Sequence, residues 1–256
     1  MDVRNLADQI VEVTLWEIRG LARSPFLAIF SFILFFSLPS PSIGKNVIEA
    51  RLGPSPYVVA AHDLYGHIAM QAVASFYVPL VLVVSFILMN SITKEFDSGL
   101  AKFYFSLPIS RLAIVVGKLL SMSLVLFSIE TLAVLSYAFL IEPWNFLGYS
   151  SIFEDSLILF SSLFIELLFI LGVVTYACML APRSWVAIAC STISLYSFLV
   201  LDEVLPQAKW YLPPYVFIPY IGFTDLASLV EPAFLAISAV LLLISTYLFV
   251  KKIEVD

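Results

Sequence analysis

Two acidic residues, Glu130 and Glu166, lie within long apolar stretches of the sequence. A carboxylate inside a membrane is costly, so it is expected to face the interior of a helix bundle or a polar pathway. If the two stretches are antiparallel helices with a short connection, both acids lie ~15 Å below the same end, at 1.5 Å per residue. Two acids that are close there would not both ionise, and we expect at least one to carry a proton.

These acids have two interpretations that the sequence leaves open. In the first, they form a polar contact for a cationic or amphiphilic cargo on a substrate pathway. In the second, they hold helices together by hydrogen bonds within the membrane. The hydroxyl groups that could take part in such bonds belong to Ser123, Ser128, Thr131, Ser161 and Ser162.

Other residue types that carry chemistry are sparse. His62 and His67 are five residues apart with Asp63 beside the first, and this spacing does not predict a metal site. No serine–histidine or cysteine–histidine set indicates a nucleophile. Gly117-Lys118 is followed by Leu119 and lacks the upstream glycine of a phosphate-binding loop, Gly-x-x-x-x-Gly-Lys-[Ser/Thr]. We therefore expect no catalytic residue, metal ligand or bound cofactor on this chain.

The composition indicates a membrane protein. Of the 256 residues, 61% are hydrophobic and only 12% are charged, whereas soluble domains carry about 25% charged residues. The net charge of -6 and the lack of a basic run argue against nucleic acid as a partner. Cys178 and Cys190 lie in apolar stretches and are expected to be buried thiols. We expect a single transmembrane domain over 1–256.

The apolar stretches predict an all-α integral membrane fold with six spans, because a span needs about 20 apolar residues. The fourth and fifth spans are separated by three residues and should form a tight helical hairpin. The expected spans are Ser24–Ile43, Ala69–Ser91, Leu112–Ile141, Ser156–Ala181, Trp185–Leu201 and Pro232–Val250.

The basic residues predict the orientation, since Lys and Arg concentrate on the cytoplasmic side. With both termini in the cytoplasm, three of the 13 basic residues fall outside, namely Lys45, Arg51 and Lys209. The other ten fall inside: Arg4, Arg19, Arg23, Lys94, Lys102, Arg111, Lys118, Arg183, Lys251 and Lys252. We expect a multi-pass protein of the cell membrane.

Two further segments are expected to lie at the membrane surfaces. Residues 1–22 predict an amphipathic helix in the inner interface, with Trp16 near the lipid headgroups. Its apolar side would carry Leu6, Ile10, Val13, Trp16 and Leu21, and its polar side mostly Asp8, Gln9, Glu12, Glu17 and Arg19. A soluble helix packed on a partner is the alternative. Residues 202–231 combine many aromatic residues with prolines, which predicts short re-entrant helices at the outer surface.

The segment between the second and third spans, TKEFDSGLAKFYFSLPISRLAIVVGK over 93–118, carries the clearest functional signal. Residues 94–107 can form a short cytoplasmic helix. Pro108 disfavours helix at Leu107 and should end it there. Ser110 can then cap the third span. A short helix jointed to a membrane helix in this way can transmit force from a soluble partner.

This segment resembles that of the membrane (permease) subunits of type-2 ABC exporters. In that family the second and third spans are joined by Glu-x-x-x-Gly-Thr, a Leu-rich helix and Leu-Pro-x-Ser-Arg, often with Gly-Lys in the following turns. The chain differs at Leu100 and Lys102, where the family commonly has Thr and often an acid. It matches at Glu95, Gly99, Leu107, Pro108, Ser110, Arg111, Gly117 and Lys118.

The resemblance implies a division of labour between subunits. In the family, the segment is a coupling helix that sits in a cleft of a separate ATP-binding subunit. Two permease chains and two such subunits form the transporter, and ATP and Mg are bound by the ATP-binding subunits. It implies an ATPase-coupling role for Glu95, Gly99, Leu107, Pro108, Ser110 and Arg111. The second permease chain could be identical or different, and the cargo is left open.

A different class of function also fits part of the sequence. An ion-coupled secondary transporter would use Glu130 and Glu166 as proton carriers and would need no ATPase. Many such transporters contain internal repeats, and none is evident in this sequence.

Overall fold

The computed structural model describes residues 5–37, 64–93, 109–141, 152–181, 183–205, 212–213 and 227–255, and these segments are almost entirely helical. Seven long helices and one π-helical turn follow one another. They are α1 (Leu6–Ala22), α2 (Pro25–Ser37), α5 (Leu64–Leu88), η1 (Met89–Thr93), α8 (Arg111–Ile141), α10 (Ile152–Leu180), α11 (Ser184–Val204) and α12 (Ala227–Val255).

Five of these helices are long and apolar enough to cross a membrane, which makes the chain a multi-pass, all-helical membrane protein. They are α5 together with η1, α8, α10, α11 and α12, and they coincide with the second to sixth spans expected from the sequence. Their apolar parts are Phe76–Thr93, Arg111–Ser136, Phe160–Leu180, Ser184–Leu201 and Pro232–Lys251. The first expected span begins as α2, a helix of 13 described residues. Its second half lies outside the described residues.

Local sequence explains where the helices begin. The Asn5 side chain accepts a hydrogen bond from the backbone N–H of Ala7 at the start of α1. The Ser24 carbonyl accepts one from the N–H of Leu27. Pro25 is the first residue of α2, a position where its fixed φ angle suits the helix and its missing N–H costs nothing. The break between α1 and α2 is therefore set by only a few residues.

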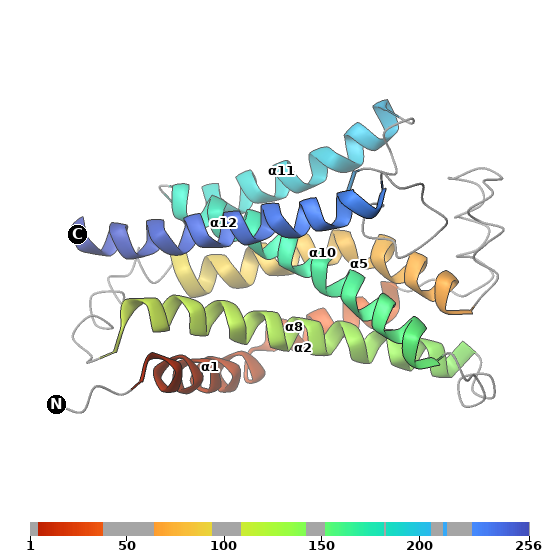
Figure 1. Ribbon diagram of the computed structural model, residues 1–256, viewed down its shortest axis with the longest axis horizontal. Helices are drawn as coiled ribbons and strands as arrows, with labels where there is room; N and C mark the ends of the chain where they lie inside the picture. Colours follow the sequence, from red (N-terminus) through yellow and green to blue (C-terminus); the bar gives the residue numbers. More distant parts are fainter. Residues whose placement is uncertain are drawn as a thin grey trace.

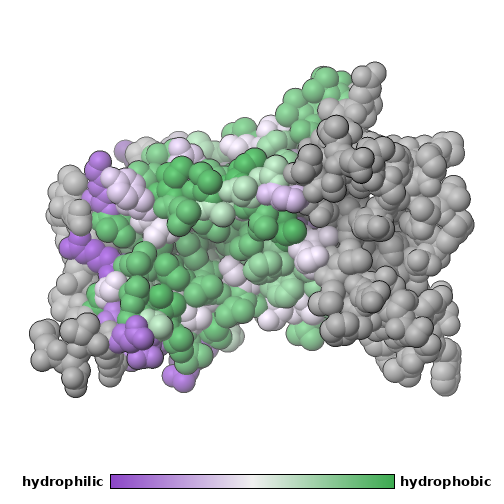
Figure 2. All heavy atoms as spheres, viewed as in Figure 1, coloured by the Kyte–Doolittle hydropathy of each residue, from purple (hydrophilic) through white to green (hydrophobic). Residues whose placement is uncertain are grey.

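The helices form a bundle whose long direction follows the five spans (Figure 1). The start of α1 and the end of α12 lie at the same end of this bundle. Figure 2 shows apolar side chains over the middle of one face, while hydrophilic side chains gather at that same end. A wide apolar band with a polar end is the surface expected of a protein that sits in a bilayer.

Helix α10 is central to the packing and contacts α5, α8, α11 and α12. Gly172 lets α12 approach, because a Cβ atom there would lie 3.2 Å from the Ser238 carbonyl oxygen. Small residues allow such close helix contacts in membranes. The Phe169 ring packs against Phe198 and Phe234, at centroid distances of 6.1 and 5.1 Å, and so joins α10 to both α11 and α12.

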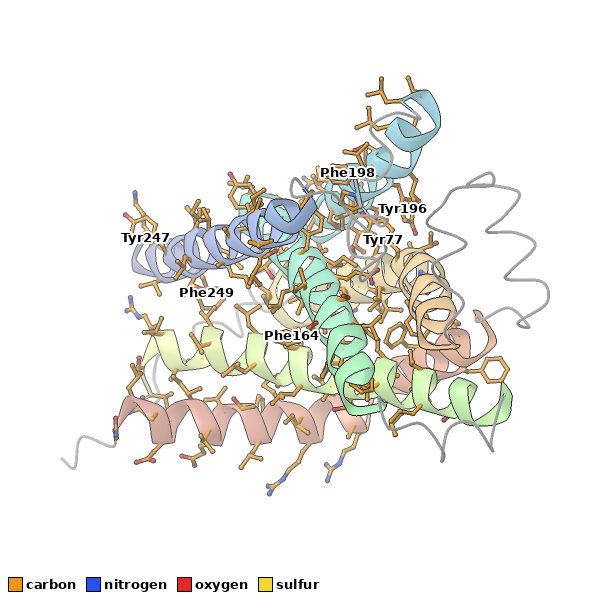
Figure 3. The ribbon with its side chains drawn as sticks, turned by 45° about the vertical axis from the view of Figure 1, so that its right-hand side comes forward. Tyr77, Phe164, Tyr196, Phe198, Tyr247 and Phe249 are labelled. Carbon is orange, nitrogen blue, oxygen red and sulfur yellow. The ribbon has the colours of Figure 1, made fainter. Side chains whose placement is uncertain are left out.

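Helices α5 and α11 are held together by side-chain hydrogen bonds. The Tyr77 hydroxyl donates to the Leu195 carbonyl at 3.0 Å, and the Tyr196 hydroxyl donates to the Val78 carbonyl at 3.1 Å. The Ser85 and Ser191 hydroxyls lie 3.0 Å apart. Figure 3 shows Tyr77 and Tyr196 close together where the two helices meet.

Some expectations need correction or fall outside the described residues. The fifth and sixth spans agree with the apolar parts Ser184–Leu201 and Pro232–Lys251, but their helices are longer, because α11 continues to Val204 and α12 begins at Ala227. Cys178 is buried as expected, but Cys190 is exposed on α11. Nearly all of the expected re-entrant segment between these helices, and the loop with His62 and Asp63, lie outside the described residues.

Candidate functional site

The first turn of α8 is fixed by two side chains. The Ser110 hydroxyl accepts a hydrogen bond from the Ala113 N–H at 3.4 Å, which confirms the cap expected from the sequence. The Ser110 N–H donates to the Gln9 side-chain oxygen on α1 at 2.8 Å. The exit of the 94–108 segment is therefore tied to α1 as well as to its own helix.

One turn further along α8, Gly117 allows α1 to approach very closely. A Cβ atom at this position would lie 2.7 Å from Cγ1 of Val13 and 3.3 Å from the Ile10 carbonyl oxygen. The Thr14 hydroxyl lies 3.4 Å from the Gly117 carbonyl oxygen and donates to it, and it also donates to the Ile10 carbonyl at 2.7 Å. Residue 117 must be small for this contact to form.

Lys118 lies at the centre of this contact and is almost completely buried. Its Nζ atom donates to Oε1 of Glu17 on α1 at 2.5 Å and to Oγ of Ser91 in η1 at 3.4 Å. A buried lysine is tolerated when it is paired and hydrogen-bonded. Three elements, α1, η1 and α8, therefore meet at one ammonium group.

We call this contact the polar junction. It consists of Gln9, Thr14, Glu17, Ser91, Ser110, Gly117 and Lys118. Residue 91 lies just before the 94–108 segment and residue 110 just after it. The described residues Ser91 and Ser110, one on each side of that segment, therefore both take part in the junction.

The packing of α1 differs from the sequence expectation. Figures 1 and 3 show α1 lying alongside α8. Glu17, which the pattern assigns to the polar side, is on the buried side because Lys118 pairs with it. Trp16 is 57% exposed and lies away from that side. A periodic pattern within α1 does not reveal a partner charge about 100 residues away.

The predicted coupling residues divide between described and undescribed parts of the chain. Glu95, Gly99, Leu107 and Pro108 lie outside the described residues. Ser110 belongs to the polar junction. Arg111 is the first residue of α8 and is half-buried.

The sequence did not single out Gln9, Thr14 and Ser91. The only sequence feature that could have indicated their part in the junction is that they are polar residues beside apolar stretches.

Glu130 and Glu166 are both completely buried. The Phe127 and Phe164 rings, from the same turns of α8 and α10, are in edge contact with centroids 5.3 Å apart. This contact brings the two acids to the same level of the bundle, as expected from the sequence. We call them the carboxyl pair. Tyr77 is also completely buried, and its helix α5 packs against α10, which carries Glu166.

The four oxygen atoms of the carboxyl pair accept no hydrogen bond from any residue that the structure describes. Of the hydroxyl groups considered for this role, those of Ser123 and Ser128 donate to the Leu119 and Leu124 carbonyls of their own helix, and that of Thr131 is itself buried without a hydrogen-bond partner among the described residues. In the described structure, the carboxyl pair therefore does not hold helices together by hydrogen bonds to protein donors.

Comparison with known proteins adds no identification: no protein-family model matches the chain, and no curated protein is significantly similar to it. The resemblance to exporter permeases therefore depends on the motif and on the helix pattern.

Proposed function

We propose that this chain is the membrane subunit of an ATP-driven type-2 ABC exporter. In this role it would couple ATP hydrolysis by a separate ATP-binding subunit to the export of a cargo across the cell membrane. The chain itself would be non-catalytic, and a pair of such chains would work with two ATP-binding subunits. ATP and Mg would be bound by those subunits.

The polar junction is the observation that carries this proposal. A coupling segment must pass a displacement to the spans without bending at its ends. Here the residues on both sides of 94–108 are tied to Lys118 or α1 by hydrogen bonds. Three motif residues, Ser110, Gly117 and Lys118, lie within the junction, so the motif and the contacts point to the same part of the chain.

Copurification tests the proposal. The chain, tagged and expressed with the genes that neighbour its own, is expected to copurify with an ATP-binding protein in equal amounts. Glu95→Ala and Arg111→Ala are expected to reduce this association. Asp8→Asn, on the exposed side of α1, is the matched control and should retain it. Transport by the purified chain alone, without ATP, would contradict the proposal.

The carboxyl pair favours a second candidate, an ion-coupled secondary transporter. In that function Glu130 and Glu166 would bind and release protons during transport. Reconstitution separates the two functions, because the secondary transporter would work in vesicles that contain only this chain and a proton gradient. The exporter would need the ATP-binding subunit and ATP.

A further inference from the structure

The carboxyl pair has no counter-charge within the described protein. Among the buried residues that the structure describes, the only basic one is Lys118, and it is paired with Glu17. Lys118 is twelve residues before Glu130 on the same helix, which places it about 18 Å away along the axis. Two acids in an apolar interior without a partner cost free energy, which a bound cation would recover.

The surroundings of the pair suit an organic cation better than a metal ion. Hard divalent cations take six or more oxygen ligands, and no cluster of three or more metal-binding side chains occurs among the described residues. Aromatic rings are close instead. Phe127 is three residues before Glu130 and on the same side of α8, and Tyr77 is completely buried on α5, which packs against α10. Aromatic faces attract desolvated organic cations.

The Tyr77 oxygen can also contribute. Its hydrogen is donated to the Leu195 carbonyl, so the oxygen presents lone pairs to its other neighbours. Helices α5, α8 and α10, which contact one another, thus contribute Tyr77, Glu130 and Glu166 to the buried interior of the bundle. Phe164, which packs on Phe127, is 39% exposed. The ring pair therefore connects the outer surface of the bundle with the turn of α8 that carries Glu130.

We propose that Glu130 and Glu166, together with the Tyr77 oxygen, bind the charged group of a lipophilic monovalent organic cation. Quaternary ammonium and phosphonium ions are members of this class. The interpretation of this cation as cargo rests on the proposed function. Binding of the cation can be measured without ATP or the ATP-binding subunit.

The test measures binding of labelled tetraphenylphosphonium to the full chain in detergent by equilibrium dialysis. Tetraphenylborate, which has the same shape and the opposite charge, is the matched ligand control. The wild type is expected to bind the cation and not the anion. Glu130→Gln and Glu166→Gln should each weaken binding by at least about tenfold, because each removes one of the two carboxyl groups that carry the negative charge of the site. Asp8→Asn removes an exposed acid and should leave binding unchanged.

A second measurement on the wild type avoids any dependence on how the variants fold. Dicyclohexylcarbodiimide modifies carboxylic acids in apolar surroundings, and mass spectrometry locates the modified residues. Tetraphenylphosphonium is expected to slow the modification of Glu130 and Glu166, and tetraphenylborate is not.

The inference is overturned if the wild type does not bind the cation, if Glu130→Gln and Glu166→Gln bind it as well as the wild type, or if the probe gives no protection. Each of these results would leave the exporter proposal standing. A failure to copurify with an ATP-binding protein would overturn the exporter proposal but not the cation site.

Discussion

The polar junction and the carboxyl pair both place ionisable side chains inside a largely apolar bundle, but the two regions differ in whether these side chains have partners. At the junction, Lys118 is paired with Glu17 and hydrogen-bonded to Ser91. At the carboxyl pair, four oxygen atoms have no hydrogen-bond partner among the described residues. The first arrangement is complete within the chain and suits a mechanical joint. The second is incomplete among the described residues, which is the feature on which the proposed cation site is based.

This comparison can be tested most strongly at Lys118. Lys118→Met leaves Glu17 buried without its partner, and Glu17→Gln does the reverse. Each single change is expected to lower the free energy of unfolding by about 3–5 kcal/mol, as is typical when one member of a buried pair is removed. The Glu17→Gln/Lys118→Met double variant should lose less than either single variant. Unfolding in mixed micelles measures all three, and strict additivity would argue against the pair.

Gly117 tests whether the junction needs close contact as well as charge. Gly117→Ala places a Cβ atom 2.7 Å from Val13, so α1 must shift. We expect a loss of about 1–3 kcal/mol, the usual effect of overpacking. Val13→Ala in the same chain should restore part of this stability, because it removes the Cγ1 atom that clashes. If the double variant is less stable than Gly117→Ala alone, the packing explanation fails.

The carboxyl pair should respond in the opposite direction. Glu166→Gln removes an acid that is buried without a described partner, so the free energy of unfolding is expected to stay equal or to rise by about 1 kcal/mol. The same type of substitution, Glu to Gln, is expected to be strongly destabilising at position 17. If Glu166→Gln lowers the free energy of unfolding as much as Glu17→Gln does, the two regions do not differ as described.

A small effect is also expected at the contact between α5 and α11. Tyr196→Phe removes the hydrogen bond to the Val78 carbonyl, which should cost about 0.5–1.5 kcal/mol. Tyr196 is partly exposed in the wild-type protein, and the loss of its hydrogen bond is therefore expected to cost little. Because the change lies outside both regions, cation binding and association with an ATP-binding protein should be unaffected.

Sequence reasoning could predict the helices because their signals are local. Long apolar stretches define five of the spans, and Ser110 caps α8 as its position in the sequence predicts. It also placed Glu130 and Glu166 at one level, since that follows from residue counting along antiparallel helices. The contacts of the polar junction could not be predicted from local patterns. Glu17 is buried because it pairs with Lys118, and these two residues are 101 positions apart in the sequence.

That separation also has a consequence for biosynthesis. When α1 and α2 leave the ribosome, the surface on which α1 will pack has not yet been translated. At about 5–20 residues per second, Lys118 is made roughly 5–20 s after Glu17. During this interval α1 must remain in another environment, and the headgroup region of the membrane suits its exposed Trp16, Val11 and Leu15. The insertion of α8 would then decide when α1 reaches its final position.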